Sequence, residues 1–159
     1  KENFKAQIAN DNSEGQIVLS GKTEDLENLI EILKDNSIKN IKLPVSAPFH
    51  CKLMENATHN MKDVIEKLKI NKVPKNIIHN YNAGLSFSEK EIKNMLISQI
   101  EGKVRWIESV KYMINNGTKS FIEIGPGKIL SGLIKRIDKN VRINSINNVS
   151  DIKEVNFND

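Results

Sequence analysis

The sequence predicts an α/β protein, and two observations support that prediction. Short apolar runs typical of strands alternate along the chain with segments whose apolar residues recur every three to four positions, as in amphipathic helices. The chain has 159 residues, of which 38% are hydrophobic, and this suffices for the core of one domain or of part of one. Alternating strands and helices over this length indicate a sheet covered by helices.

The first 46 residues indicate an incomplete ferredoxin-like unit. The expected elements are strands at 5–9 and 16–20, a helix from its cap Thr23 to about Asn36, and a half-buried strand over 40–45. Strand, strand, helix, strand is what remains of a βαββαβ unit without its first strand and helix. Because that first strand is central in the sheet, its loss would leave buried backbone groups unpaired, so we expect the missing piece upstream.

Helical and strand-like segments continue to alternate from residue 47 to about residue 150. We expect helices at 52–68, from the capping box Ser88–Glu91 through Gln99, at 106–116 before a left-handed cap at Gly117, and at 129–137. Strands are expected near 77–78 after a loop around Pro74, at 120–124 and at 141–146. The tail at 151–159 is expected to be loosely ordered.

Composition restricts the function classes only weakly. The chain carries 24 Lys+Arg against 20 Asp+Glu, and the net charge of +4 is spread out, which is too weak to argue for a nucleic-acid partner. It suits an acidic partner or a phosphate-bearing molecule, but equally a solvated lysine-rich face. No apolar run approaches the length needed to span a membrane. The single cysteine, Cys51, excludes an intramolecular disulfide and favours a cytoplasmic location, and the start at Lys1 suggests a chain that begins partway through a larger protein.

Three local features carry weak functional signals. His50 follows a predicted strand and precedes a predicted helix, where site residues collect, although a loop histidine without a catalytic role is the alternative. Its neighbour Cys51 does not make a metal site or a Cys-His dyad, since adjacent extended side chains point apart and no further ligands have suitable spacing. Gln99 is a polar residue on an apolar helical stripe, and a structural amide would explain it. The segment Gly125-Pro126-Gly127-Lys128 fits a tight strand-to-helix turn better than a phosphate loop.

Taken in order, several blocks of the chain resemble the bacterial malonyl-CoA:acyl carrier protein transacylases, from residue 6 to about residue 150. They are Ala9-Asn10-Asp11-Asn12 with Gln16-Ile17-Val18-Leu19-Ser20-Gly21, Val45-Ser46-Ala47-Pro48-Phe49-His50, Gln99 with Val104-Arg105-Trp106, and Glu123-Ile124-Gly125-Pro126-Gly127-Lys128-Ile129-Leu130. The resemblance implies the acyltransferase fold. Residues 1–46 would then be part of its ferredoxin-like small subdomain, and residues 47–150 the C-terminal part of its α/β-hydrolase-like core.

The resemblance implies ping-pong malonyl transfer from malonyl-CoA, as substrate, to the phosphopantetheine thiol of acyl carrier protein in fatty acid biosynthesis, with no bound cofactor and no metal. His50 matches the general base of the serine nucleophile, and the backbone carbonyl of the residue matching Gln99 orients its imidazole. Three residues match positions at the mouth of the cleft, namely Asn10, Asn12 and Gln16. Phe49, directly before His50, matches the position that goes with malonyl rather than methylmalonyl.

The chain departs from the family by what it lacks. No G-x-S-x-G occurs in it, so the nucleophile is absent, as are the family's malonyl-binding arginine and the backbone amides of the oxyanion hole. We therefore expect the chain to be inactive by itself and to need the missing N-terminal half as a partner. Two alternatives stay open: a polyketide-type acyltransferase with another acyl preference, and a non-catalytic remnant that binds acyl carrier protein or has no function.

Overall fold

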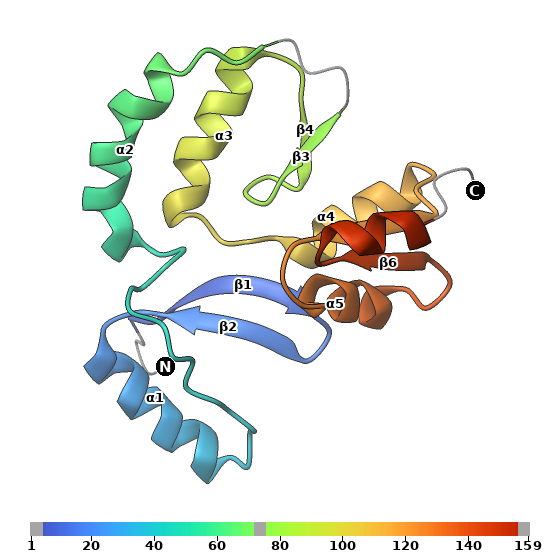
Figure 1. Ribbon diagram of the computed structural model, residues 1–159. Coiled ribbons are helices and arrows are strands. Elements are labelled where there is room, and N and C mark those ends of the chain that lie inside the picture. Colours follow the sequence, from blue (N-terminus) through green and yellow to red (C-terminus); the bar gives the residue numbers. More distant parts are fainter. Residues whose placement is uncertain (1–4, 72–75, 156–159) are drawn as a thin grey trace.

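Three two-stranded sheets and five α-helices make up the described part of the chain, residues 5–71 and 76–155, in the computed structural model (Figure 1). The predicted α/β character is confirmed. The loop expected around Pro74 lies outside the described residues. None of the described helices is both long and apolar enough to cross a lipid bilayer.

The N-terminal hairpin is formed as predicted but has a longer first strand. β1 (Gln7–Ser13) pairs antiparallel with β2 (Gln16–Ser20), with register shifts on either side of Asn10 and Asp11. The sequence predicts a turn from residue 10, because residues 10–15 are rich in turn formers. Strand geometry continues to Ser13 because the other edge of β1 is also paired, with the main chain at Val104.

Helix α1 (Thr23–Asp35) has its C-cap at Asn36, where the sequence predicts the end of the helix. Its N-cap is Lys22, and Thr23, the predicted cap, is the first helical residue. The strand expected over 40–45 is absent: these residues have no strand assignment, and Ile41 and Val45 are 75% and 60% exposed. Strand geometry needs a hydrogen-bonded neighbour, and the described chain provides none for this segment. The prediction of a strand at 40–45 was wrong. The ferredoxin-like unit is incomplete, and the missing elements include strands with which this segment could pair.

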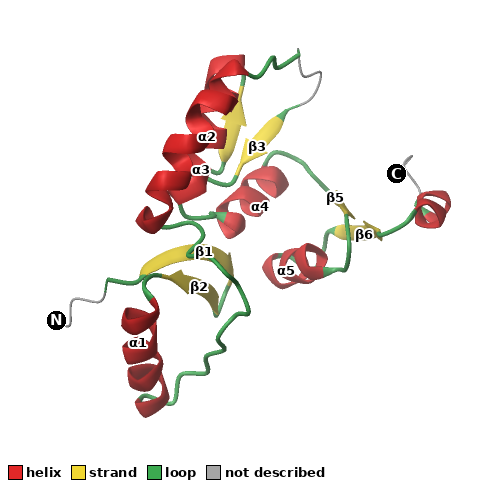
Figure 2. Ribbon diagram, turned by 60° about the vertical axis from the view of Figure 1, so that its left-hand side comes forward, coloured by secondary structure: helices red, strands yellow, loops and turns green. Residues whose placement is uncertain are grey.

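Two packed helices follow. The expected helix at 52–68 begins with a 3₁₀ turn, η1 (Lys52–Met54), and continues as α2 (Glu55–Lys67), which lies beside α3 (Glu89–Glu101) (Figure 2). The capping box is confirmed, since the Ser88 side chain accepts from the Glu91 N–H and the Glu91 carboxylate accepts from the Ser88 N–H. Between these helices, β3 (Ile77–His79) pairs with β4 (Gly84–Ser86), a strand that the sequence did not indicate.

The C-terminal part contains the buried core. α4 (Trp106–Asn115) ends before Gly117, whose φ of 92° confirms the left-handed cap. β5 (Ser120–Ile124) and β6 (Arg142–Ile146) are parallel and joined through α5 (Ile129–Ile137), all three near their predicted bounds. The core contains Val110, Ile134 and Val141. A 3₁₀ helix, η2 (Val149–Glu154), extends into the predicted loose tail, of which 156–159 lie outside the described residues.

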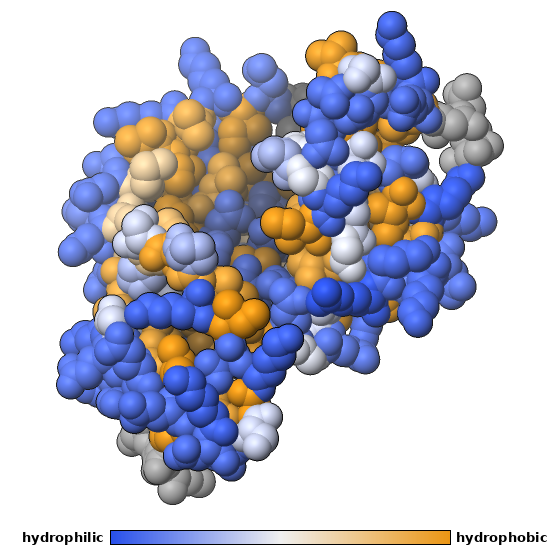
Figure 3. Space-filling model, turned by 60° about the horizontal axis from the view of Figure 1, so that its bottom comes forward, coloured by the Kyte–Doolittle hydropathy of each residue, from blue (hydrophilic) through white to orange (hydrophobic). Residues whose placement is uncertain are grey.

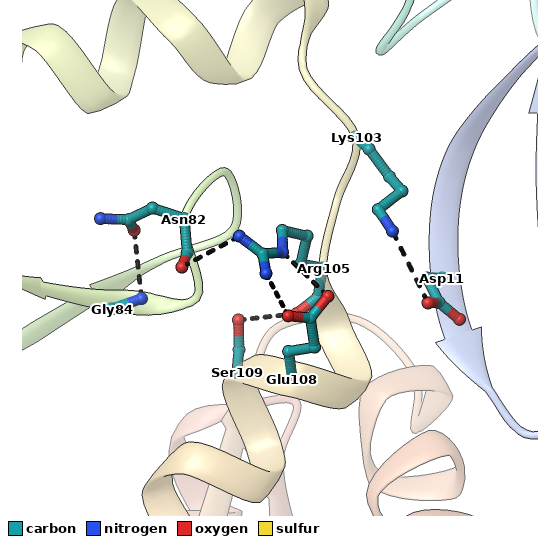
Figure 4. A network of polar contacts seen from close by, with 7 residues as sticks. All are labelled: Asp11, Asn82, Gly84, Lys103, Arg105, Glu108 and Ser109. Atoms are coloured by element: carbon teal, nitrogen blue, oxygen red, sulfur yellow. Dashed lines mark hydrogen bonds and ion pairs between the residues drawn. The ribbon is translucent and has the colours of Figure 1, made fainter.

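β1 connects the hairpin to the rest of the chain. The Val104 N–H donates to the Ala9 carbonyl at 2.8 Å, and the Asp11 N–H donates to the Val104 carbonyl at 2.9 Å. Lys103 adds an ion pair with Asp11, with 3.8 Å between Nζ and Oδ2, and Arg105 pairs with Glu108 (Figure 4). The segment that joins α3 to α4 therefore pairs with the free edge of β1 over a short stretch at Val104, on the side opposite β2.

Much apolar surface is uncovered. Between residues 5 and 155, leaving out 72–75, no further strand joins the parallel pair β5 and β6, although parallel sheets are normally buried on both faces. Ile122 and Ile124, on one face of β5, are 38% and 79% exposed, and Ile129 after the strand is 73% exposed. Figure 3 shows apolar side chains gathered along the hollow in the middle of the face that it draws. Exposed apolar surface of this extent is typical of a site that binds a partner, a membrane or a ligand.

Glu123 of β5 caps the N-terminus of α5. Its carboxylate accepts from the Leu130 N–H at 3.0 Å and the Ser131 N–H at 2.8 Å, two of the N–H groups that have no partner inside the helix. Burial alone would raise the pKa of Glu123, but the hydrogen bonds from Ser131, Leu130 and Ile129 together lower it below its ordinary value. This contact closes the turn at Gly125 and Gly127, whose φ values of 143° and 90° are those that glycine tolerates.

Replacing Glu123 by Ala should lower the free energy of unfolding by about 1 kcal/mol at pH 7, the usual effect of losing a helix cap. A lowered folded-state pKa stabilises the fold above the unfolded value of about 4.3, and this stabilisation is lost as pH falls through the folded-state pKa. Urea unfolding of both proteins at pH 7 and pH 3 tests this. Glu14→Ala, in the exposed β1–β2 turn, is the control; a Glu123 effect that is equally large at pH 3 would contradict the account.

Candidate active site

His50 lies on the loop between α1 and η1 with an unusual backbone conformation. Its φ is 59°, in the left-handed region that non-glycine residues rarely adopt. Cys51, the next residue, is buried, and its thiol donates to the Pro48 carbonyl at 3.2 Å. Lys52 begins η1, and its N–H donates to Oε1 of Gln7 at 2.8 Å. These contacts turn the half-buried imidazole toward the C-terminal end of α3.

The imidazole is held by a main-chain carbonyl. Nδ1 of His50 lies 2.9 Å from the carbonyl oxygen of Gln99, 49 residues away in sequence. Gln99 is in the last turn of α3, where carbonyls lack partners inside the helix, and the N–H of Gly102 donates to Ser98 instead. The contact implied by the resemblance is therefore present, and it uses the backbone of Gln99. The catalytic roles of the two residues stay predictions.

This contact determines which ring nitrogen carries the proton. A carbonyl oxygen only accepts hydrogen bonds, so Nδ1 of His50 is the donor and the neutral ring carries its proton there. Nε2 then presents its lone pair, as a general base requires.

An open pocket of about 530 Å³ lies beside His50. Its walls come from β1, the His50 loop, η1, α2, α3 and the 81 and 102–103 segments; the residues are Gln7, Ile8, His50, Lys52, Thr58, Tyr81, Ile97, Ser98, Glu101, Gly102 and Lys103. The Tyr81 ring lies against Gly102 so closely that a Cβ there would come within 2.2 Å of it. Only glycine fits at that position.

The other predicted site residues are not among the residues that line this pocket. Asn10 is paired through its backbone with Val104, and Asn12 is half-buried on β1. The Gln16 side chain accepts from Arg136 of α5 at 2.5 Å. Phe49 is 48% exposed next to His50. Their roles in substrate binding stay predictions.

Four polar residues that line the pocket were not predicted from the sequence: Gln7, Lys52, Tyr81 and Lys103. A tertiary contact between segments far apart in the chain leaves no periodic signal, so none of these four was marked by its local pattern. Within residues 5–71 and 76–155, no group of three or more His, Cys, Asp or Glu side chains is arranged to hold a metal ion.

The described chain thus combines an α/β fold with a loop histidine that is held by a main-chain carbonyl and lines an open pocket. Solved structures of acyltransferases have the same fold. The malonyl CoA-acyl carrier protein transacylase of Clostridium perfringens superposes with a TM-score of 0.87 at 38% identity, covering 94% of this chain and 47% of that one. A malonyl-transacylase in complex with its type II PKS acyl-carrier protein gives 0.88 at 30% identity, covering 93% and 48%.

Among curated proteins, the malonyl CoA-acyl carrier protein transacylase of Bacillus subtilis is 40% identical over 137 residues, covering 86% of this chain and 43% of the relative. No family model matches the chain. The chain spans about half the length of the curated relatives it matches. It is homologous to the malonyl CoA-acyl carrier protein transacylases, and it corresponds to their C-terminal half.

Replacing Gln99 by Ala should leave the His50 hydrogen bond intact, because the acceptor is the main-chain oxygen and alanine favours the helix. Long-range ¹⁵N–¹H NMR correlations of the histidine rings report which nitrogen is protonated. We expect the Nδ1-protonated form of His50 in both proteins at neutral to alkaline pH. Loss of that form in Gln99→Ala would show that the amide side chain, and not the carbonyl, holds the ring.

Proposed function

We propose that this chain is the C-terminal half of an acyltransferase that moves malonyl from malonyl-CoA to the phosphopantetheine thiol of acyl carrier protein in fatty acid biosynthesis. The observation that carries the proposal is the 2.9 Å contact between His50 Nδ1 and the Gln99 carbonyl beside an open pocket. Homology to the transacylases supports the acyl group and both partners. We also propose a cytoplasmic location, because the free thiol of Cys51 suits a reducing compartment.

In the proposed reaction His50 is the general base. Nε2 takes the proton of a serine on the N-terminal half while that oxygen attacks the malonyl thioester, and it then gives this proton to the sulfur of coenzyme A as the carbon–sulfur bond breaks. The neutral His50 next takes the proton of the phosphopantetheine thiol, whose sulfur attacks the acyl-serine, and it returns this proton to the serine oxygen as the ester bond breaks. A neutral carbonyl stabilises the imidazolium less than a carboxylate does. A thioester is an activated acyl donor, so this weaker support suffices.

The remaining predicted residues have substrate roles in this proposal. Phe49 is half-exposed beside His50, and its ring would occupy the space that the α-methyl group of methylmalonyl needs, which favours malonyl. Asn10, Asn12 and Gln16 lie on the hairpin that borders the cleft. Lys52 and Lys103 line the pocket and provide positive charge for an anionic acyl donor.

The partner that completes the site is the N-terminal half, which carries the G-x-S-x-G serine. The isolated parallel pair β5–β6 supports this, since further strands and covering helices would bury the exposed Ile122 and Ile124. The unpaired segment 40–45 would likewise gain its missing strand neighbour. We propose that the chain without this partner transfers no malonyl.

In a complete enzyme containing this chain, replacing His50 by Ala should reduce malonyl transfer by about 10²–10⁴-fold, the usual effect of losing a general base. The measurement is the initial rate of malonyl transfer from malonyl-CoA to holo-acyl carrier protein. His59→Ala is the matched control, because His59 is exposed on α2. Retention of most activity in His50→Ala, or an equal loss in the control, would remove His50 from the mechanism.

A further inference from the structure

The backbone of His50 is held in a conformation that costs energy. A left-handed φ is unfavourable in a residue with a Cβ, and it persists only where surrounding contacts impose it. In the described chain, two hydrogen bonds join residues 46–52 to distant segments: His50 Nδ1 to the Gln99 carbonyl, and the Lys52 N–H to the Gln7 side chain. The others are local, such as the Cys51 thiol to the Pro48 carbonyl.

Gln7 caps η1 from a distance. The Lys52 N–H is the first of that 3₁₀ helix, and the N-cap residue Cys51 gives it no side-chain partner. Oε1 of Gln7 accepts from it at 2.8 Å, across 45 residues of sequence. Gln7 is half-buried, and it lines the same pocket as His50.

The same strand holds the other side of the His50 contact. Val104, five residues after Gln99, exchanges hydrogen bonds of 2.8 and 2.9 Å with Ala9 and Asp11. β1 thus fixes the histidine loop through Gln7 and the end of α3 through its backbone. The link to the histidine loop is made by the Gln7 side chain, so a substitution removes it, whereas the Val104 hydrogen bonds are made by the main chain.

We propose that Gln7 is a positioning residue for His50, which holds the loop so that Nδ1 reaches the Gln99 carbonyl and Nε2 faces the pocket. Because it gives His50 a catalytic task, this inference rests on the proposed function. It assigns to β1 a task beyond pairing with β2. Without the Gln7 oxygen, the loop relaxes from the left-handed backbone and the imidazole loses its single acceptor.

The first test is the protonation pattern of the His50 ring in the chain itself, read from ¹⁵N–¹H NMR. Gln7→Leu should convert a predominantly Nδ1-protonated ring to a mixture of both forms, and Gln7→Glu, which retains an acceptor oxygen, should restore the wild-type pattern. Leu19→Ala is the control, because Leu19 pairs with Ile8 and its loss weakens the hairpin without touching the Lys52 N–H. Circular dichroism shows whether each variant is folded, and Gln7→Ala replaces Gln7→Leu if the latter is not.

An unchanged protonation pattern of the His50 ring in the folded Gln7 variant overturns the inference, and so does an equal change in Leu19→Ala.

The second test is kinetic and uses a complete enzyme. Gln7→Leu should lower kcat about tenfold, which is part of the loss expected for a missing base, and should leave KM within about twofold of the wild-type value. A raised KM with unchanged kcat would make Gln7 a binding residue and overturn its positioning role. A changed protonation pattern of the His50 ring in Gln7→Leu, together with no malonyl transfer by the complete wild-type enzyme, would support the positioning role and overturn the proposed function.

Discussion

The site depends on one hydrogen bond, between the His50 imidazole and the Gln99 main-chain carbonyl. This hydrogen bond joins the loop before η1 to the last turn of α3. The two segments are held near each other by this bond and by the contacts that each makes with β1. A helix end offers a carbonyl that the helix cannot satisfy, and a ring nitrogen satisfies it. The ring orientation, the tautomer and the direction of Nε2 follow from that pairing.

This constraint explains why the hairpin matters to a site that lies mostly elsewhere. β1 pairs with β2 on one edge and with Val104 on the other, and α4 and α5 also contact it. Removing the hairpin would therefore release both segments that meet at His50. Where the described part of the chain provides no packing neighbour, as at residues 40–45 and around β5, apolar side chains are exposed.

Local signals predicted the helices well. The Ser88–Glu91 box and the Gly117 cap are properties of a few adjacent residues, so their outcome could be read from sequence. The strand expected at 40–45 is absent, because strand pairing depends on a neighbour that the described residues do not provide. β4 is three residues long and has too few positions for alternation to appear.

The candidate site divides in the same way. His50 was singled out by its place before a helix, but its pairing with the Gln99 carbonyl came from the resemblance and not from spacing. Gln7 had no signal at all, because a glutamine in a strand becomes informative only when its distant partner, the Lys52 N–H, is known. Non-local contacts of this kind depend on the tertiary fold.

The central claim is that this chain is the histidine-bearing half of a malonyltransferase. The most direct measurement is malonyl transfer from malonyl-CoA to holo-acyl carrier protein by the chain alone, and by the chain produced together with the N-terminal half of the Bacillus subtilis relative. The account predicts no transfer by either half alone and transfer by the two together. Transfer by this chain alone, or an inactive complex in which both halves are folded and bound, would contradict it.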